Sequence, residues 1–250
     1  MNSADLLTFF EERFEEVDAY VDLLEELEKA AQDGAPRLHG TEYKISAMQQ
    51  KILYSSLYLQ LYNLVEATVS RCVEAITQAA TQAGQWKPHQ LSDELQREWV
   101  RSIARTHTDM SPEHRLKHAM QLSEHIVQQL PVGRFSVEAG GGGNWDDEAI
   151  FAMGKRLGCV ISVTEQTRRG VKANMRDDLG PMKLVKDRRN GLAHGSISFV
   201  DCADGVAVDE LRRMASSVES YLREVIECFI RHIDSHNFLR PNFRPNGGAP

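Results

Sequence analysis

The sequence predicts an all-α protein, a helical bundle with an additional helix at its N-terminus. Two observations support this fold class. Apolar residues recur at spacings of three and four over most of the chain, which is the pattern of one buried helix face. Clusters of glycine and proline separate these stretches, and no internal repeat is present. The chain has 250 residues, of which 42% are hydrophobic, so it can bury the core of one large domain or of two small ones.

The N-terminal half contains four predicted helices. The first covers residues 3–31, where acidic residues lie between the apolar positions. The second, 41–83, is the longest and is apolar on most of its faces, so we expect it at the centre of the domain or buried in a dimer. Two shorter helices follow at about 92–106 and 112–129. The latter has Ser111 as a suitable N-cap and proline at its first helical position.

The C-terminal half predicts three more helices, at about 144–158, 181–195 and 207–236. Asn144 is a suitable N-cap for the first of them, with Asp147 at the third helical position. The four glycines at 140–143 predict a flexible joint. Residues 159–171 contain several β-branched residues and predict a short strand or a loop.

These elements predict one helical domain with extensions at both ends. Residues 1–34 form an acidic N-terminal helix, and residues 41–236 form the helical domain. Residues 237–250 are rich in proline, asparagine and glycine and predict a disordered tail.

The charge of the chain is unevenly distributed. The net charge is −7, but residues 1–33 hold eleven acidic and two basic residues, a local charge of −9. Residues 155–195 hold ten basic and four acidic residues, a local charge of +6. Phosphate binding requires a local positive potential, so this segment is compatible with RNA, although it also suits a solvated helix face. The acidic first helix either is solvated itself or covers the basic segment electrostatically.

The cysteines and histidines give no pattern of a metal site. The four cysteines lack any close spacing, so we expect reduced thiols in a cytoplasmic protein, with no zinc ribbon and no disulfide framework. His114 and His118 are four residues apart, but no glutamate follows the first and no third ligand has a fixed spacing. We therefore expect no metal and no cofactor. No segment has the signal-peptide or membrane-spanning pattern, so we expect no membrane partner.

The stretch from Arg188 to His194 combines a guanidinium, a side-chain amide and an imidazole. On a straight helix Asn190 and His194 share one face. Gly191 costs a helix interior about 1 kcal/mol relative to alanine. We therefore expect that the helix ends or is distorted there, which lets the backbone approach another group closely and brings Arg189 and His194 together. Such groups can clamp a phosphate, orient it and carry a proton. In the alternative interpretation this is a plain helix end, where Arg189 pairs with a nearby acid such as Asp187.

The stretch resembles the R-x(4–6)-H signature of the HEPN superfamily. Arg189, four intervening residues and His194 fit the signature, and Asn190 is the polar residue that usually follows the arginine. The segment from Tyr62 to Glu66 resembles the Tyr-x-x-x-Glu helix of a stand-alone, nuclease-like branch of HEPN proteins. The residues around Asn144 and Trp145 resemble the middle helix of that branch. The resemblance covers roughly residues 41–235.

The resemblance implies a helical bundle that dimerises so that two motifs face each other. It implies Arg189, Asn190 and His194 as catalytic residues and Glu66, Asn63 and Arg188 as their supports. The local positive charge around the motif indicates Lys183, Lys186 and Arg188 as RNA-binding residues. A glutamate buried unpaired in an apolar helix is costly, so Glu66 either holds Arg189 or Arg188 or faces solvent.

The expected activity is metal-independent cleavage of RNA by attack of its own 2′-OH, in a toxin or phage-defence effector. The expected partners are RNA, a second copy of the chain, and an antitoxin or sensor protein. The alternative is a non-catalytic HEPN-like module that binds RNA or a nucleotide, or serves as a dimer scaffold in a larger complex.

Overall fold

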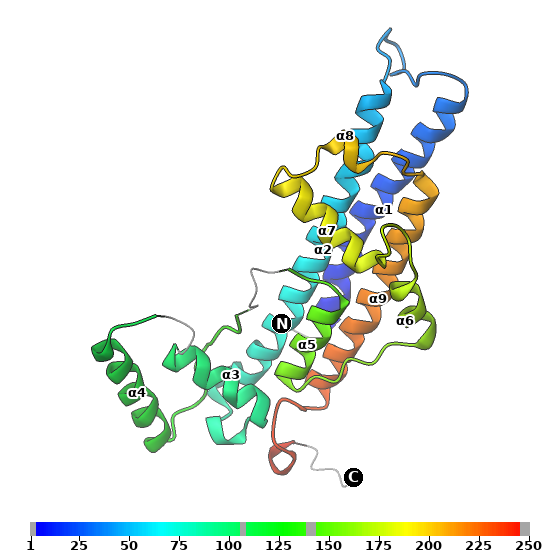
Figure 1. Ribbon diagram of the computed structural model, residues 1–250. Helices are drawn as coiled ribbons and strands as arrows, with labels where there is room; N and C mark the ends of the chain where they lie inside the picture. The colour runs from blue at the N-terminus through cyan, green and yellow to red at the C-terminus, as the bar shows by residue number, and fades with distance from the viewer. Residues whose placement is uncertain (1–3, 106–108, 139–143, 246–250) are drawn as a thin grey trace.

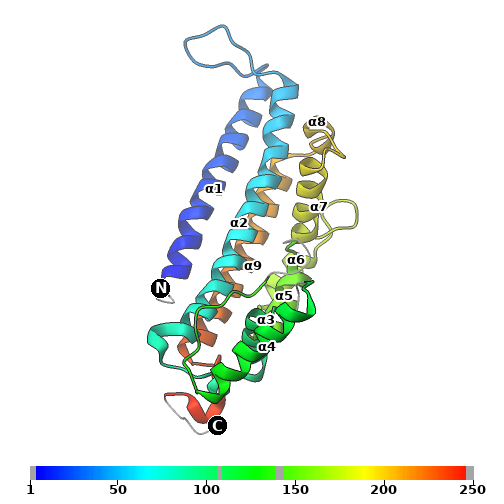
Figure 2. The same ribbon diagram turned by 90° about the vertical axis from the view of Figure 1, so that its left-hand side faces the viewer.

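The computed structural model describes residues 4–105, 109–138 and 144–245. Within these residues the chain is helical and contains no strand, which confirms the predicted fold class. Three long helices form the centre of the molecule: α1 (Ala4–Gln32), α2 (Ala47–Thr81) and α9 (Val208–Asp234). Figures 1 and 2 show the three helices running side by side along the long axis of the molecule.

Shorter helices pack around this centre or project from it. Their bounds are α3 (Asp93–Ala104), α4 (Pro112–Val127), α5 (Asp147–Leu157), α6 (Glu165–Lys172), α7 (Pro181–Ala193) and α8 (Phe199–Cys202). Among the described residues, single 3-10 turns lie at Gln82–Gly84, Pro88–Gln90 and Pro241–Phe243. Helix α7 lies against α2, and α4 projects from the lower end of the bundle (Figure 1).

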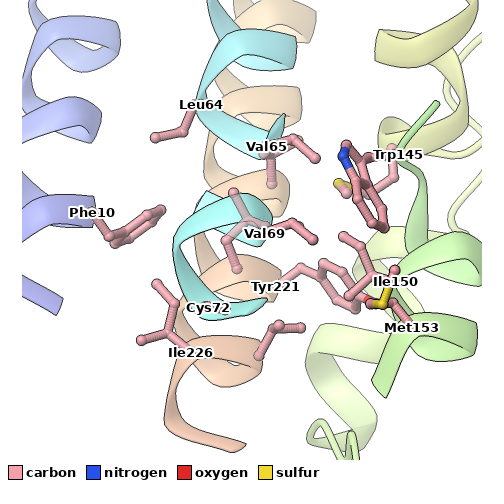
Figure 3. Packing of buried hydrophobic residues seen from close by; sticks show 14 of the residues in the cluster. Phe10, Leu64, Val65, Val69, Cys72, Trp145, Ile150, Met153, Tyr221 and Ile226 are labelled. Atoms are coloured by element: carbon pink, nitrogen blue, oxygen red, sulfur yellow. The ribbon is translucent and has the colours of Figure 1, made fainter. Parts of the chain in front are cut away.

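Helix α2 occupies the centre of the bundle, as its apolar faces predict. It begins at Ala47, six residues later than the sequence suggested, because Ser46 and Gln49 form a reciprocal capping box that satisfies the first backbone donors. Side chains from α1, α2, α5 and α9 share one hydrophobic core. Figure 3 shows part of it, including Phe10, Val69 and Ile226.

Helix α1 packs into this core rather than over the basic segment. Its acidic residues engage α9: Arg212 forms ion pairs with Asp18, Asp22 and Glu25, the last at 2.6 Å. The view of Figure 2 places α2 between α1 and α7. The suggestion that the acidic helix covers the basic segment is therefore wrong. The residue boundaries of the predicted domains stay a prediction, but α1 shares its buried side chains with the central core.

In the middle of the chain the predicted cap of α5 is wrong, and the prediction of a strand or a loop for residues 159–171 holds only as a loop up to Thr164. The N-cap of α5 is Asp146, whose side chain accepts a hydrogen bond from the backbone N–H of Ala149 at 2.8 Å, and not Asn144. The segment 159–171 does not form a strand. Its first residues are extended, and Thr164 then caps α6 by accepting from the N–H of Thr167. Glu224 accepts hydrogen bonds from both threonine hydroxyls and thereby fixes α6 on α9.

The C-terminal segment follows a defined path over much of its length. Phe238 and Leu239 are buried, and Leu239 forms an isolated bridge with Leu91. The prediction of disorder is therefore wrong for residues 237–245, because two apolar side chains find space beside α3. Residues 246–250 and the glycine run at 140–143 lie outside the described residues. No helix among the described residues is long and apolar enough to cross a membrane.

A buried histidine near the end of α9 makes the stability depend on pH. Burial lowers the pKa of His232 to about 4, and the side chain is 3% exposed. The unfolded chain, in which histidine titrates near 6.5, therefore takes up the proton first, and the folded state loses stability as the pH falls from about 6.5 to about 4. We expect the free energy of unfolding to fall by up to ~3 kcal/mol from this group, measured by urea denaturation. His232→Gln should reduce that loss, and an unchanged pH profile would contradict the assignment.

Candidate functional site

The site is built on the last two turns of α7. Leu184 and Val185 are buried and hold the helix against the bundle. The backbone stays helical through His194, whose N–H bonds the carbonyl of Asn190 at 3.0 Å. Gly195, at φ +69°, then takes the left-handed conformation that reverses the chain. His194 is consequently exposed at the end of the helix.

Gly191 does not break or distort α7, which ends two residues later at Ala193, but the predicted close approach of its backbone is present. Its role is a close approach: the chain turns back so that the N–H of Ser196 bonds the carbonyl of Gly191 at 2.9 Å. A Cβ atom at Gly191 would lie 2.8 Å from Cγ2 of Ile197. Because the helix is regular, Asn190 and His194 share a face, and Arg189 lies about 140° from His194 around the axis.

This close approach predicts the cost of a methyl group at the site. Gly191→Ala should destabilise the protein by up to about 2 kcal/mol, because the overlap of the added Cβ with the branched side chain of Ile197 outweighs the gain of about 1 kcal/mol in helix propensity. Urea denaturation measures the change. In an Ile197→Ala background the same substitution should cost little, and an undiminished cost there would show that the overlap is not its source.

Arg189 is held by three different groups. Its guanidinium carbon lies 4.2 Å from the centre of the Tyr62 ring, within the range of a cation–π contact. Its Nη2 lies 3.6 Å from Oε2 of Glu66, and its Nη1 donates a hydrogen bond of 2.9 Å to Oδ1 of Asn190. The side chain is still 28% exposed. The guanidinium is therefore fixed in direction but accessible to a ligand.

A loop before α5 completes this network. Asn190 donates from Nδ2 to Oδ1 of Asn144 at 3.0 Å, and the N–H of Trp145 donates to the Tyr62 hydroxyl at 3.1 Å. Asn144 therefore binds the motif and does not cap a helix as its sequence position suggests. The signal in the sequence was that Asn144 and Asp146 are both good N-caps, and only one of them can cap α5.

The remaining predicted supports lie apart from Arg189. Asn63 is on α2 but exposed. Arg188 forms an ion pair with Asp177 on the loop before α7, and its Nε is buried without a hydrogen-bond partner. Of the two arginines considered as partners of Glu66, the structure pairs it with Arg189. Arg189 thus pairs with a residue of another helix and not with Asp187, as a plain helix end would have it.

The predicted RNA-binding residues all have acidic partners. Lys183 contacts Glu148 at 2.8 Å, and this hydrogen bond lowers the pKa of the Glu148 carboxyl. Lys186 pairs with Asp146, the residue that caps α5. Asp146 and Glu148 lie outside residues 155–195, so these two carboxylates partly offset the local charge of +6 counted along that segment.

In the part of the chain that the structure describes, the histidines and cysteines outside the motif form no metal cluster. All four cysteines are buried, and burial raises the pKa of the Cys159 thiol to about 12. Among residues 4–105, 109–138 and 144–245, no three histidine, cysteine, aspartate or glutamate side chains are grouped as metal ligands would be. His107 lies outside these residues. His114 contacts the Ser111 hydroxyl at 3.3 Å.

The fold and the site define a class of protein: an all-α bundle that presents an arginine and a histidine, four residues between them, at the exposed end of one helix. A family model described as MAE_28990-like HEPN matches residues 3–238. The chain therefore belongs to this HEPN family. The match also includes α1, which lies outside the range of the resemblance noted above. No curated protein and no solved structure matches the chain.

Membership in the family indicates a nuclease or an RNA-related module. HEPN domains commonly bind RNA and form dimers. The residues that could take part in such an activity are those assembled at the end of α7, and their arrangement is the basis of the proposal below.

Proposed function

We propose that the protein is a metal-independent endoribonuclease whose active site requires two copies of the chain. One observation carries the proposal: the Arg189 guanidinium is fixed by Tyr62, Glu66 and Asn190 yet remains partly exposed, and His194 is exposed at the end of the same helix. A purely structural role of Arg189 would not require an exposed histidine at the same end of the helix. A guanidinium held in one direction suits the stabilisation of a phosphate oxygen.

The chemistry needs two proton carriers. The 2′-oxygen of RNA attacks the adjacent phosphorus and loses its proton to a base, while the bond from phosphorus to the 5′-oxygen breaks and that oxygen takes a proton from an acid. Each copy supplies one motif histidine. Histidine changes its protonation near neutral pH, so a pair of His194 side chains can act as one neutral base and one protonated acid. The products are a 2′,3′-cyclic phosphate and a free 5′-hydroxyl.

Arg189 and Asn190 complete the proposed site. Arg189 stabilises the negative charge on the non-bridging oxygens in the transition state. Asn190 keeps its carbonyl toward Arg189 because its amide nitrogen is bound to Asn144. Tyr62 and Glu66 are positioning residues, since both act through Arg189. In the cell, such an enzyme suits a toxin or a phage-defence effector controlled by an antitoxin or a sensor protein.

The test is incubation of the purified protein with labelled tRNA and mRNA in the presence of EDTA. We expect fragments of defined length. Intact RNA after prolonged incubation, at concentrations where the protein binds it, would contradict the nuclease and favour the second candidate.

The second candidate is a non-catalytic RNA- or nucleotide-binding module, or a dimer scaffold in a larger complex. The acidic partners of Lys183, Lys186 and Arg188 favour it, because they reduce the positive potential next to the motif. The two candidates differ in what His194 does. Only the nuclease requires it for a change in the RNA.

A further inference from the structure

Helix α4 stands out because none of its sixteen residues is buried. It nevertheless carries large apolar side chains that are mostly exposed: Leu116 at 63%, Met120 at 65% and Val127 at 77%. A helix in a single folded chain normally buries its apolar stripe against the core. The stripe of α4 is turned away from the core.

The two sides of α4 have different roles. Its partly buried residues are His118, Leu122 and His125, and the ring of His125 lies 5.1 Å from that of Trp99 on α3. These three residues therefore mark the side that holds the helix to the bundle. Successive residues of an α-helix are rotated by about 100° around its axis, so the exposed apolar residues Leu116, Met120 and Val127 lie on the side of α4 opposite to these three. We define the outer stripe as Leu116, Met120, Ser123 and Val127.

The spacing of the outer stripe is four, three and four residues. This is the narrow seam of a helix that pairs with another helix, and it is not the broad face of a helix lying on a globular core. In an antiparallel pair of two identical copies, Leu116 meets Val127 of the second copy, and Met120 meets Ser123 of the second copy. The stripe is thus complementary to itself about a two-fold axis.

The charges beside the outer stripe favour the same pairing. Lys117 and Glu124 lie on one edge of the stripe, whereas Ala119 and Ile126 lie on the other. In an antiparallel pair, each edge of the stripe lies beside the same edge of the second copy. Lys117 of each copy therefore lies opposite Glu124 of the other. In a parallel pair the charged edge would meet the apolar edge. The charges therefore select a second copy in antiparallel orientation.

Helix α4 also projects in a suitable direction. In Figure 1, α4 and the end of α7 that carries the motif both point to the left of the bundle, and in Figure 2 both lie on the side that faces the viewer. A second copy bound at α4 would lie on the side of the molecule toward which the end of α7 points.

We propose that α4 is a dimerisation arm, whose outer stripe packs antiparallel against the outer stripe of a second copy. Pairing removes three large apolar side chains per copy from water and forms two Lys117–Glu124 contacts. The proposal stands on the surface of α4 and does not require the protein to cleave RNA.

The first test is the dissociation constant of the dimer, measured on the full chain by sedimentation. Met120→Glu should raise it by about 100-fold, because each pair would bury two unpaired carboxylates. Gln121→Glu is the matched control, since it adds the same charge to the next residue, which is exposed and about 100° away around the helix. The control should dimerise as the wild type does, and circular dichroism should show equal helix content in all three proteins.

The second test is charge reversal. Lys117→Glu and Glu124→Lys should each weaken the dimer by about tenfold, and the double variant should restore it, because exchanged charges still meet in an antiparallel pair. A wild type that is monomeric at micromolar concentration would overturn the proposal, as would a dimer that Met120→Glu leaves unchanged. His194→Ala should remain dimeric, so a failure of the nuclease and a failure of the arm are distinguishable.

Discussion

Replacing His194 by alanine is expected to abolish RNA cleavage while leaving the fold and the dimer intact. The imidazole is exposed at the end of α7 and belongs to no buried cluster, so its loss removes little packing. In the proposed mechanism the substitution removes the base from one copy and the acid from the other. Each proton transfer contributes about 10²–10⁴-fold, so the loss should reach at least ~10⁴-fold in the rate of cleavage.

The matched control is His39→Ala. His39 is also exposed but lies in the loop between α1 and α2, away from the motif. The two variants should have equal thermal stability and equal oligomeric state, and only the control should cleave labelled RNA at the wild-type rate. Equal activity of both variants would remove His194 from the mechanism.

Arg189 is expected to give the second largest effect. Arg189→Ala should lower the rate of cleavage by about 10²–10³-fold, comparable to the removal of one preorganised donor to a developing oxyanion. Arg189→Lys should recover little of this loss. An ammonium group cannot donate to Asn190 and stack on Tyr62 as the planar guanidinium does.

Single-turnover kinetics on labelled RNA measures the effect of both substitutions. Arg213→Ala serves as the control, because Arg213 is an exposed arginine of α9 whose partner is Asp209. Because Arg189 is proposed to act in the transition state, the rate at saturating protein should fall more than the affinity for RNA. A pure loss of affinity would assign Arg189 to binding and would favour the non-catalytic module.

The helices of the bundle were predictable because their signals are local. Capping residues and apolar periodicity place α3 and α4 within two residues of their observed bounds. The start of α2 was misplaced because the residues before Ser46 continue the helical pattern, and only the capping box decides where the helix begins. Helix α6 was missed because it has only eight residues and follows a run of β-branched residues.

The motif itself could be identified from the sequence, but its surroundings could not. The ion pair of Arg189 with Glu66 joins residues far apart in the chain, and the resemblance to a family suggested it. The local pattern offers both Asn144 and Asp146 as caps of α5, but it does not indicate that Asn144 binds Asn190. The charge count along residues 155–195 overstated the positive potential beside the motif. The carboxylates that pair with Lys183 and Lys186 come from outside this segment, so a local count does not include them.

The measurement that tests the nuclease most directly is the chemistry of the RNA ends after cleavage in EDTA. Attack by the 2′-oxygen without a metal predicts fragments that end in a 2′,3′-cyclic phosphate and begin with a 5′-hydroxyl. Fragments with 3′-hydroxyl and 5′-phosphate ends, or cleavage that stops in EDTA, would contradict a mechanism carried by His194 and Arg189.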